Sequence, residues 1–247
     1  MRFLPAFTAL LLVSACGPAK PTPDAGPDTS CGLDCASQEV FGLIKNRCFE
    51  YSTDPSSKQT PPELGVWVKP DLFQLEGGID TLAVEYRKGG QIVQTDFFTF
   101  KNGDLMLMRR IAGSQSVTYR TGTTITGVKW LSPSTGPGEN FSTSTEAFLS
   151  RDDSSTMTDY RITTDSPTAL EKRSPLATYE TAFKVLFGET PDHGSDSRRV
   201  FVPGTGFSII ASPFNLLGGS PTPVYLQRIR DIGTADAGTE SCSLGLP

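Results

Sequence analysis

From residue 79 onward, apolar and polar side chains alternate with a period of two, which is typical of β-strands with one buried face. The segments Ile79–Lys88, Gln91–Lys101 and Asp104–Ala112 are separated by the dipeptides Gly89-Gly90 and Asn102-Gly103. Both dipeptides favour two-residue hairpin turns, because their residues tolerate positive φ. The pattern therefore predicts an antiparallel three-stranded meander.

Turns of this kind fix which residues face each other across the strands. The expected pairs are Tyr86–Val93, Val84–Thr95 and Leu82–Phe97 across the first turn, and Phe98–Leu107, Phe97–Met108, Asp96–Arg109 and Lys101–Asp104 across the second. The last two pairs would join opposite charges, which stabilises an antiparallel sheet.

The two faces of the meander differ in polarity. One is apolar along its length and is predicted to be core, with Leu82, Val84, Tyr86, Val93, Phe97, Met106 and Met108. The other is solvated at one end and apolar beside Asn102-Gly103, where another part of the chain or a ligand would cover Phe98, Phe100, Leu105 and Leu107.

Beyond residue 112, the alternation of apolar and polar residues predicts further short strands. They are predicted at 115–121, 124–131, 147–150, 156–163, 198–202, 207–211 and 224–232, and segment 177–187 fits either period, with its Thr, Val and aromatic content favouring a strand. Upstream, 37–48 carries an apolar stripe that Ser37 can cap, which predicts a short helix. This succession predicts a mainly β fold: a single antiparallel sheet, strongly curved into a half-barrel or barrel, with a short N-terminal helix.

The first sixteen residues follow a different pattern. Arg2 precedes an apolar stretch at 3–13, and Val13-Ser14-Ala15 leads directly into Cys16. This is the layout of a secretory signal peptide, and the apolar run is too short to span a bilayer. An ordinary secretory signal with an incidental Cys is the alternative interpretation.

A Cys directly after Val-Ser-Ala resembles the lipobox of bacterial lipoproteins, over residues 1–17. The resemblance implies that the Cys16 thiol is lipidated, that the chain is cut before Cys16, and that the new amine is acylated. Gly17 stands where an Asp would retain lipoproteins of this family in the inner membrane. The resemblance therefore implies the outer membrane.

Residues 17–30 contain four prolines and no bulky apolar side chain, which predicts an extended spacer of up to roughly 40 Å. Its composition resembles the linkers of surface lipoproteins in gliding soil bacteria. The predicted organisation is a signal peptide at 1–15, a lipidated Cys and Pro-rich tether at 16–30, and a disulfide-stapled β domain at 31–247.

Charge and cysteine content narrow the possible partners. The formal charge is −5 and becomes −6 when Arg2 leaves with the signal peptide, so nucleic acid is not an expected partner. Besides Cys16, the four cysteines are Cys31, Cys35, Cys48 and Cys242. In an exported protein they predict two disulfides, with three pairings open, each of which ties Cys242 to 31–48. Zinc is less favoured, because the Cys31–Cys35 spacing has no matching pair downstream.

Catalytic signatures are weak. Asp192, His193 and Ser195 are residue types of a nucleophilic triad, but a Gly-containing loop of seven residues cannot align three side chains. The acidic pairs at 152–153 and 192/196 follow no calcium-binding repeat. We therefore expect no catalytic, cofactor-binding or metal-binding residues.

The resulting expectation is an outer-membrane lipoprotein with a non-catalytic binding or structural role. Its partners would be the membrane, through the anchor, and envelope proteins or polymers, as part of a surface or motility assembly. One alternative is a half-barrel lipid or lipoprotein carrier that holds a lipid ligand at the apolar end of the second meander face. Another is an envelope hydrolase that uses loop carboxylates.

Overall fold

The computed structural model describes residues 32–150, 154–189, 197–211, 222–232 and 242. In these residues one short helix, α1 (Cys35–Phe41), accompanies fourteen strands. The strands are β1 Arg47–Ser52, β2 Leu64–Leu75, β3 Ile79–Lys88, β4 Gln91–Lys101, β5 Asp104–Ala112, β6 Gln115–Thr121, β7 Thr124–Ile125, β8 Val128–Leu131, β9 Asn140–Leu149, β10 Ser154–Asp165, β11 Phe183–Glu189, β12 Ser197–Val202, β13 Gly206–Ala211 and β14 Val224–Asp231.

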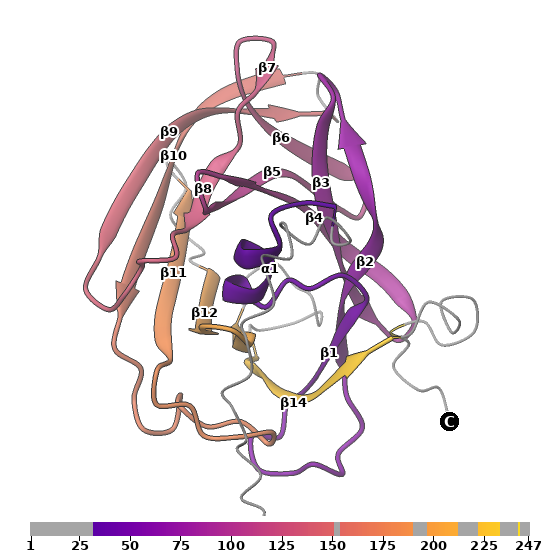
Figure 1. Cartoon of the computed structure of the whole chain (residues 1–247), viewed down its shortest axis with the longest axis vertical. Helices are drawn as coiled ribbons and strands as arrows, with labels where there is room; N and C mark the ends of the chain where they lie inside the picture. The colour runs from indigo at the N-terminus through magenta and orange to yellow at the C-terminus, as the bar shows by residue number, and fades with distance from the viewer. Residues whose placement is uncertain (1–31, 151–153, 190–196, 212–221, 233–241, 243–247) are drawn as a thin grey trace, which may run out of the picture.

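The strands form one antiparallel sheet that closes on itself. Twelve of them follow the order β6-β9-β10-β11-β12-β13-β14-β1-β2-β3-β4-β5, and pairing of β5 with β6 completes the ring. Figure 1 shows β1, β2 and β3 on one side of this barrel, β9 and β10 on the other, and α1 between them. The predicted mainly β fold, with a strongly curved antiparallel sheet and a short N-terminal helix, is confirmed.

The helix is shorter than the predicted 37–48. Asp34 caps it by accepting hydrogen bonds from the Ser37 amide at 3.0 Å and the Ser37 hydroxyl at 2.8 Å, so the cap lies three residues before the expected one. Gly42 ends it in the left-handed conformation at φ 68°. The chain then turns, and the predicted last residue, Cys48, belongs to β1.

Gly42 is also constrained by a neighbour. A Cβ at this position would lie 2.4 Å from the backbone carbonyl of Thr205, whereas a Cβ at Gly77, with a similar φ of 81°, would meet nothing within 4 Å. We expect Gly42→Ala to cost roughly 1–3 kcal/mol of unfolding free energy, because both conformation and contact oppose it. Urea denaturation measures this, and Gly77→Ala serves as the control for φ alone. Equal losses in the two variants would show that the close approach is unimportant.

Several strands differ from their predicted bounds. β1 and β2 were not predicted, and 124–131 is divided into β7 and β8 at Thr126-Gly127, where both amides donate to the Tyr119 carbonyl at 3.1 Å. β9 and β10 are longer than expected, and only the second half of 177–187 lies in a strand, β11.

The predicted pairs hold next to the second turn and fail beyond a bulge. Phe98–Leu107 and Lys101–Asp104 are confirmed. The other pairs are wrong by one residue, because β4 bulges at Val93 and β5 bulges at Met108. The observed pairs are Tyr86–Gln94, Val84–Asp96, Leu82–Phe98, Phe97–Arg109 and Asp96–Arg110.

A slip of one residue moves side chains to the opposite face of a sheet. Leu82, Val84 and Tyr86 belong to the barrel core as predicted. Three other residues of the predicted core face lie instead in a separate cluster on the outer wall: Phe97, Met106 and Met108. In exchange, Asp96 and Arg110 face the interior.

Candidate functional site

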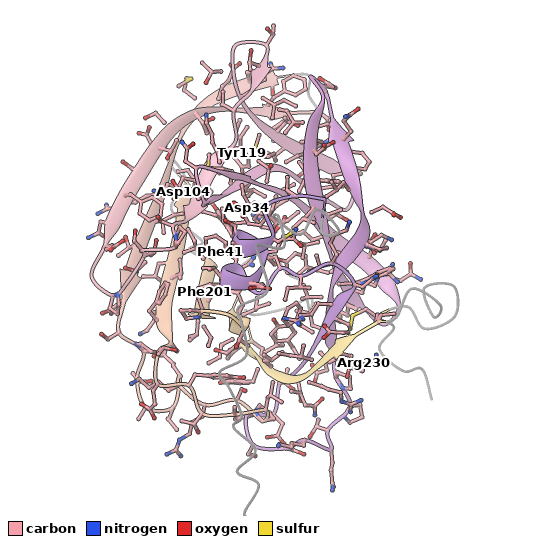
Figure 2. The ribbon with its side chains drawn as sticks, viewed as in Figure 1. Asp34, Phe41, Asp104, Tyr119, Phe201 and Arg230 are labelled. Atoms are coloured by element: carbon pink, nitrogen blue, oxygen red, sulfur yellow. A yellow bond between two sulfur atoms is a disulfide. The ribbon has the colours of Figure 1, made fainter. Side chains whose placement is uncertain are left out.

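Aromatic side chains fill the barrel. Phe98 lies 4.9 Å from Trp130 between ring centroids, and Trp130 lies 5.7 Å from Phe207. Phe41 of α1 reaches into this core, where it stacks on Phe100 at 6.0 Å and lies at a tilt to Phe201 at 6.1 Å between ring centroids. Figure 2 shows Phe41 and Phe201 near the centre of the barrel. The apolar end of the second meander face is therefore covered by the chain itself.

A small cavity lies within the barrel, among described residues of β1 to β4 and β13. Its volume is about 20 Å³, and its walls include Leu43, Phe49, Tyr51 and Val66. This is room for about one water molecule. A pocket that encloses a lipid-sized ligand needs several hundred Å³. This cavity therefore has no room for an acyl chain.

An ion pair lies inside the barrel, on β4 and β5. Arg110 donates to both carboxylate oxygens of Asp96, from Nε at 2.7 Å and from Nη2 at 3.0 Å, and Gln94 donates to the same carboxylate at 2.9 Å. Asp96 is fully buried. Burial opposes the charge of the Arg110 guanidinium, but attraction and hydrogen bonding to Asp96 hold its pKa well above the ordinary value.

A second buried guanidinium, that of Arg199 on β12, lies among aromatic rings. Its Nη1 donates to the Tyr86 hydroxyl at 3.0 Å, and its Cζ lies 4.6 Å from the Trp130 ring centroid. Trp130 Nε1 in turn donates to the Tyr160 hydroxyl at 2.8 Å. Burial raises the pKa of Tyr86. These hydrogen bonds join β12 to β3 through Arg199 and Tyr86, and β8 to β10 through Trp130 and Tyr160.

Three of the four cysteines predicted to form disulfides lie among the described residues. Cys48 and Cys242 form a disulfide, so the end of the chain is tied to β1 as predicted. Cys35 is also disulfide-bonded. Cys16 and Cys31 lie outside the described residues. So do Asp192, His193, Ser195 and the acidic residues at 152–153 and 196.

Two further observations concern the described part of the chain. It contains no group of three His, Cys, Asp or Glu side chains placed to hold a metal ion. Its one helix has neither the length nor the apolar composition to cross a membrane.

The outer wall of β14, β1, β2 and β3 gathers charged side chains in two rows. In the first row Arg228 faces Glu50, which faces Gly65, which faces Arg87. In the second row Arg230, Cys48, Trp67 and Glu85 follow one another across the same strands. Lys69 follows Trp67 on the outer side of β2. We call this set of nine residues the basic face.

Carboxylates of the basic face lie beneath its cations. Glu50 is held by Arg230 at 2.6 Å and Arg228 at 3.5 Å, and only 5% of its side chain is exposed, against 54% for Arg228. Glu85 is 12% exposed and lies between Arg87 at 2.5 Å and Lys69 at 3.5 Å. Cations therefore form the outer layer over Glu50, whereas Arg87, at 14%, is nearly as buried as Glu85.

Trp67 lies at the centre of the basic face. The Lys69 ammonium lies 4.1 Å from its ring centroid and the Arg87 guanidinium 5.1 Å from it, which are distances of cation–π contact. On its other side Trp67 packs with Ile232 and the Cys48–Cys242 disulfide. These contacts leave the ring only 5% exposed.

Sequence reasoning missed both the interior ion pair and the basic face. The ion pair depends on a β-bulge, which the pattern of residues does not predict. The basic face depends on β1 and β2, for which a signal exists: Leu64, Val66 and Val68 alternate with Gly65, Trp67 and Lys69.

The outer apolar cluster lies beside the basic face, across β2 to β5. Phe73 is 46% exposed, and its ring lies 4.9 Å from that of Phe97. Leu75, Ala83 and Met108 complete the buried part of the cluster. The exposed carboxylates in the same hairpin are Asp71, Glu76 and Asp80.

These features define a class of protein by architecture: a twelve-stranded antiparallel barrel that is filled by side chains and a short helix, with a disulfide joining β1 to the C-terminal segment. Comparison with known proteins gave no match to a family, a curated protein or a solved structure.

Proposed function

We propose that this protein is an outer-membrane-anchored lipoprotein with a non-catalytic binding or structural role in the cell envelope. The observation that carries the proposal is Cys16, placed directly after Val13-Ser14-Ala15 and a short apolar run. A Pro-rich tether and four further cysteines, as expected of an exported protein, support it.

The filled interior supports a role played by the outer surface. Side chains of α1 occupy the barrel centre, and the polar groups inside are engaged with one another. Contacts with envelope proteins or polymers would therefore use the outer wall and the loops. Two or three acyl chains, at about 0.8 kcal/mol per buried CH₂, would hold such a domain at the membrane.

Lipidation is tested by labelling producing cells with radioactive palmitate. The protein is expected to incorporate label, and Cys16→Ser is expected to abolish incorporation completely, because the thioether sulfur is lost. Cys31→Ser, fifteen residues downstream, is the matched control and keeps the label.

The position of the cut is read from the mass of the purified chain. Mature protein is expected to begin at Cys16 and to carry acyl groups. A chain that retains residues 1–15, or a Cys16→Ser chain that is still labelled, would refute the anchor.

A further inference from the structure

We infer that the basic face docks on anionic phospholipid headgroups of the membrane that holds the anchor, and so fixes the orientation of the barrel. The inference rests on the proposed lipid anchor. Phosphate oxygens are the ligand chemistry, and Arg228, Arg230 and Lys69 are the exposed groups that would contact them.

Charge is the first argument. The face carries four cations and two carboxylates, a net charge of +2, within a chain whose formal charge is −5. Glu50 is 5% exposed, whereas Arg228 and Arg230 are 54% and 32% exposed and Lys69 is 31% exposed. The surface that an approaching headgroup meets is therefore formed by these three cations, because Arg87 and Glu85, at 14% and 12%, are both largely buried.

The first described residue, Gly32, lies near one end of the basic face. The described chain begins at Gly32, where a Cβ would lie 3.6 Å from the Lys45 ammonium and 3.3 Å from Leu72. Lys45 precedes Asn46, whose amide donates to the Val68 carbonyl at 2.9 Å, next to Lys69. The described chain therefore begins near the end of the basic face that Lys69 occupies.

Acidic groups bound the face at that end. Asp231 is held by Arg47 at 2.8 Å, and Asp71 is exposed two residues beyond Lys69. Asp71, Glu76 and Asp80 accompany the outer apolar cluster, so that neighbouring surface is unfavourable for an anionic membrane. The contrast between the two surfaces favours one orientation.

A small electrostatic gain is sufficient because the anchor already confines the barrel near the membrane. Each cation close to an anionic surface contributes about 1 kcal/mol, so a net charge of +2 gives a preference of about 30-fold for the docked orientation. Salt weakens the preference, because the Debye length is about 8 Å at physiological ionic strength.

Trp67 provides a local probe. It is one of two tryptophans, and the other, Trp130, is 1% exposed within the core. The full lipidated protein is incorporated in vesicles of phosphatidylcholine, or of phosphatidylcholine mixed with phosphatidylglycerol, that carry a nitroxide quencher on the headgroups. We expect quenching of tryptophan fluorescence in the mixed vesicles, loss of it at high salt, and its removal by Trp67→Phe.

Charge variants test the mechanism. Arg228→Gln with Lys69→Gln removes the net charge of +2 but keeps the closest partner of each carboxylate, Arg230 for Glu50 and Arg87 for Glu85. Quenching, normalised to the same variant without quencher, is expected to fall to the level in phosphatidylcholine. The matched control, Arg161→Gln with Arg173→Gln, removes two exposed arginines elsewhere, and Arg161 lies on β10, six strands from β2 around the barrel.

Equal quenching in neutral and anionic vesicles would overturn the inference, as would an equal loss in the control variant or no quenching at all. Failure of the anchor is distinguishable, because a protein without acyl chains would not float with the vesicles. Protein that floats with unquenched Trp67 contradicts the docking and leaves the anchor intact.

Discussion

Replacing Cys48 and Cys242 together with alanine is expected to lower the free energy of unfolding by about 5 kcal/mol. The bridge spans 194 residues of sequence, and chain-entropy models assign about this gain to closing so long a loop in the unfolded state. Both sulfurs are buried against Trp67 and Ile232, so lost packing adds to the effect. Urea denaturation followed by circular dichroism measures the change.

Reduction provides the control for this prediction. A reducing agent removes both the Cys48–Cys242 bridge and the disulfide of Cys35 in the native chain, whereas in the double variant only the latter remains to be reduced. The variant is therefore expected to respond less to reduction than the native chain does. A double variant as stable as the oxidised native protein would show that the bridge contributes nothing.

The presence of disulfides could be predicted from the sequence, but their pairing could not. An even number of cysteines behind a predicted export signal is sufficient to expect bridges. Which sulfurs meet depends on the path of β1 and of the C-terminal segment in space. The prediction that Cys242 is tied to 31–48 needed only the number and positions of the cysteines, and it is confirmed by the Cys48–Cys242 bridge.

Hairpins were the most predictable part of the fold. Gly-Gly and Asn-Gly dipeptides determine their own backbone conformation, and both Asn102 and Gly103 have positive φ. The bounds of β3, β4 and β5 followed directly. Closure of the ring did not, because pairing of β6 with β9 and of β14 with β1 joins strands distant along the chain and depends on the curvature of the whole sheet.

The interior ion pair was unpredictable for a local reason. Two-residue turns predict Asp96 opposite Arg109, both on a solvated face. The bulge at Met108 inserts one residue, so Asp96 faces Arg110 and both side chains enter the barrel. A bulge changes the face of a side chain without changing the alternation that precedes it, so the sequence pattern carries no sign of it.

The expected consequence is a strong effect of Asp96→Asn, a loss of about 3–5 kcal/mol in the free energy of unfolding. The amide has nearly the shape of the carboxylate but lacks the charge that compensates the buried Arg110 guanidinium. The surface pair Asp104–Lys129, at 2.9 Å with side chains 25% and 34% exposed, provides the control. Asp104→Asn is expected to cost less than about 1 kcal/mol, because water screens that pair.

A double variant separates the cost of the isolated charge from the value of the pair. Asp96→Asn with Arg110→Met removes both charges and leaves the amide oxygen as an acceptor for Gln94, which donates to Asp96 at 2.9 Å in the native chain. It is expected to be more stable than Asp96→Asn alone, because an uncompensated buried charge costs more than a neutral, packed replacement. The loss in the double variant is compared with the sum of the losses in Asp96→Asn and Arg110→Met alone. If it equals that sum, the guanidinium of Arg110 does not depend on Asp96, and the pair only fills space within the barrel.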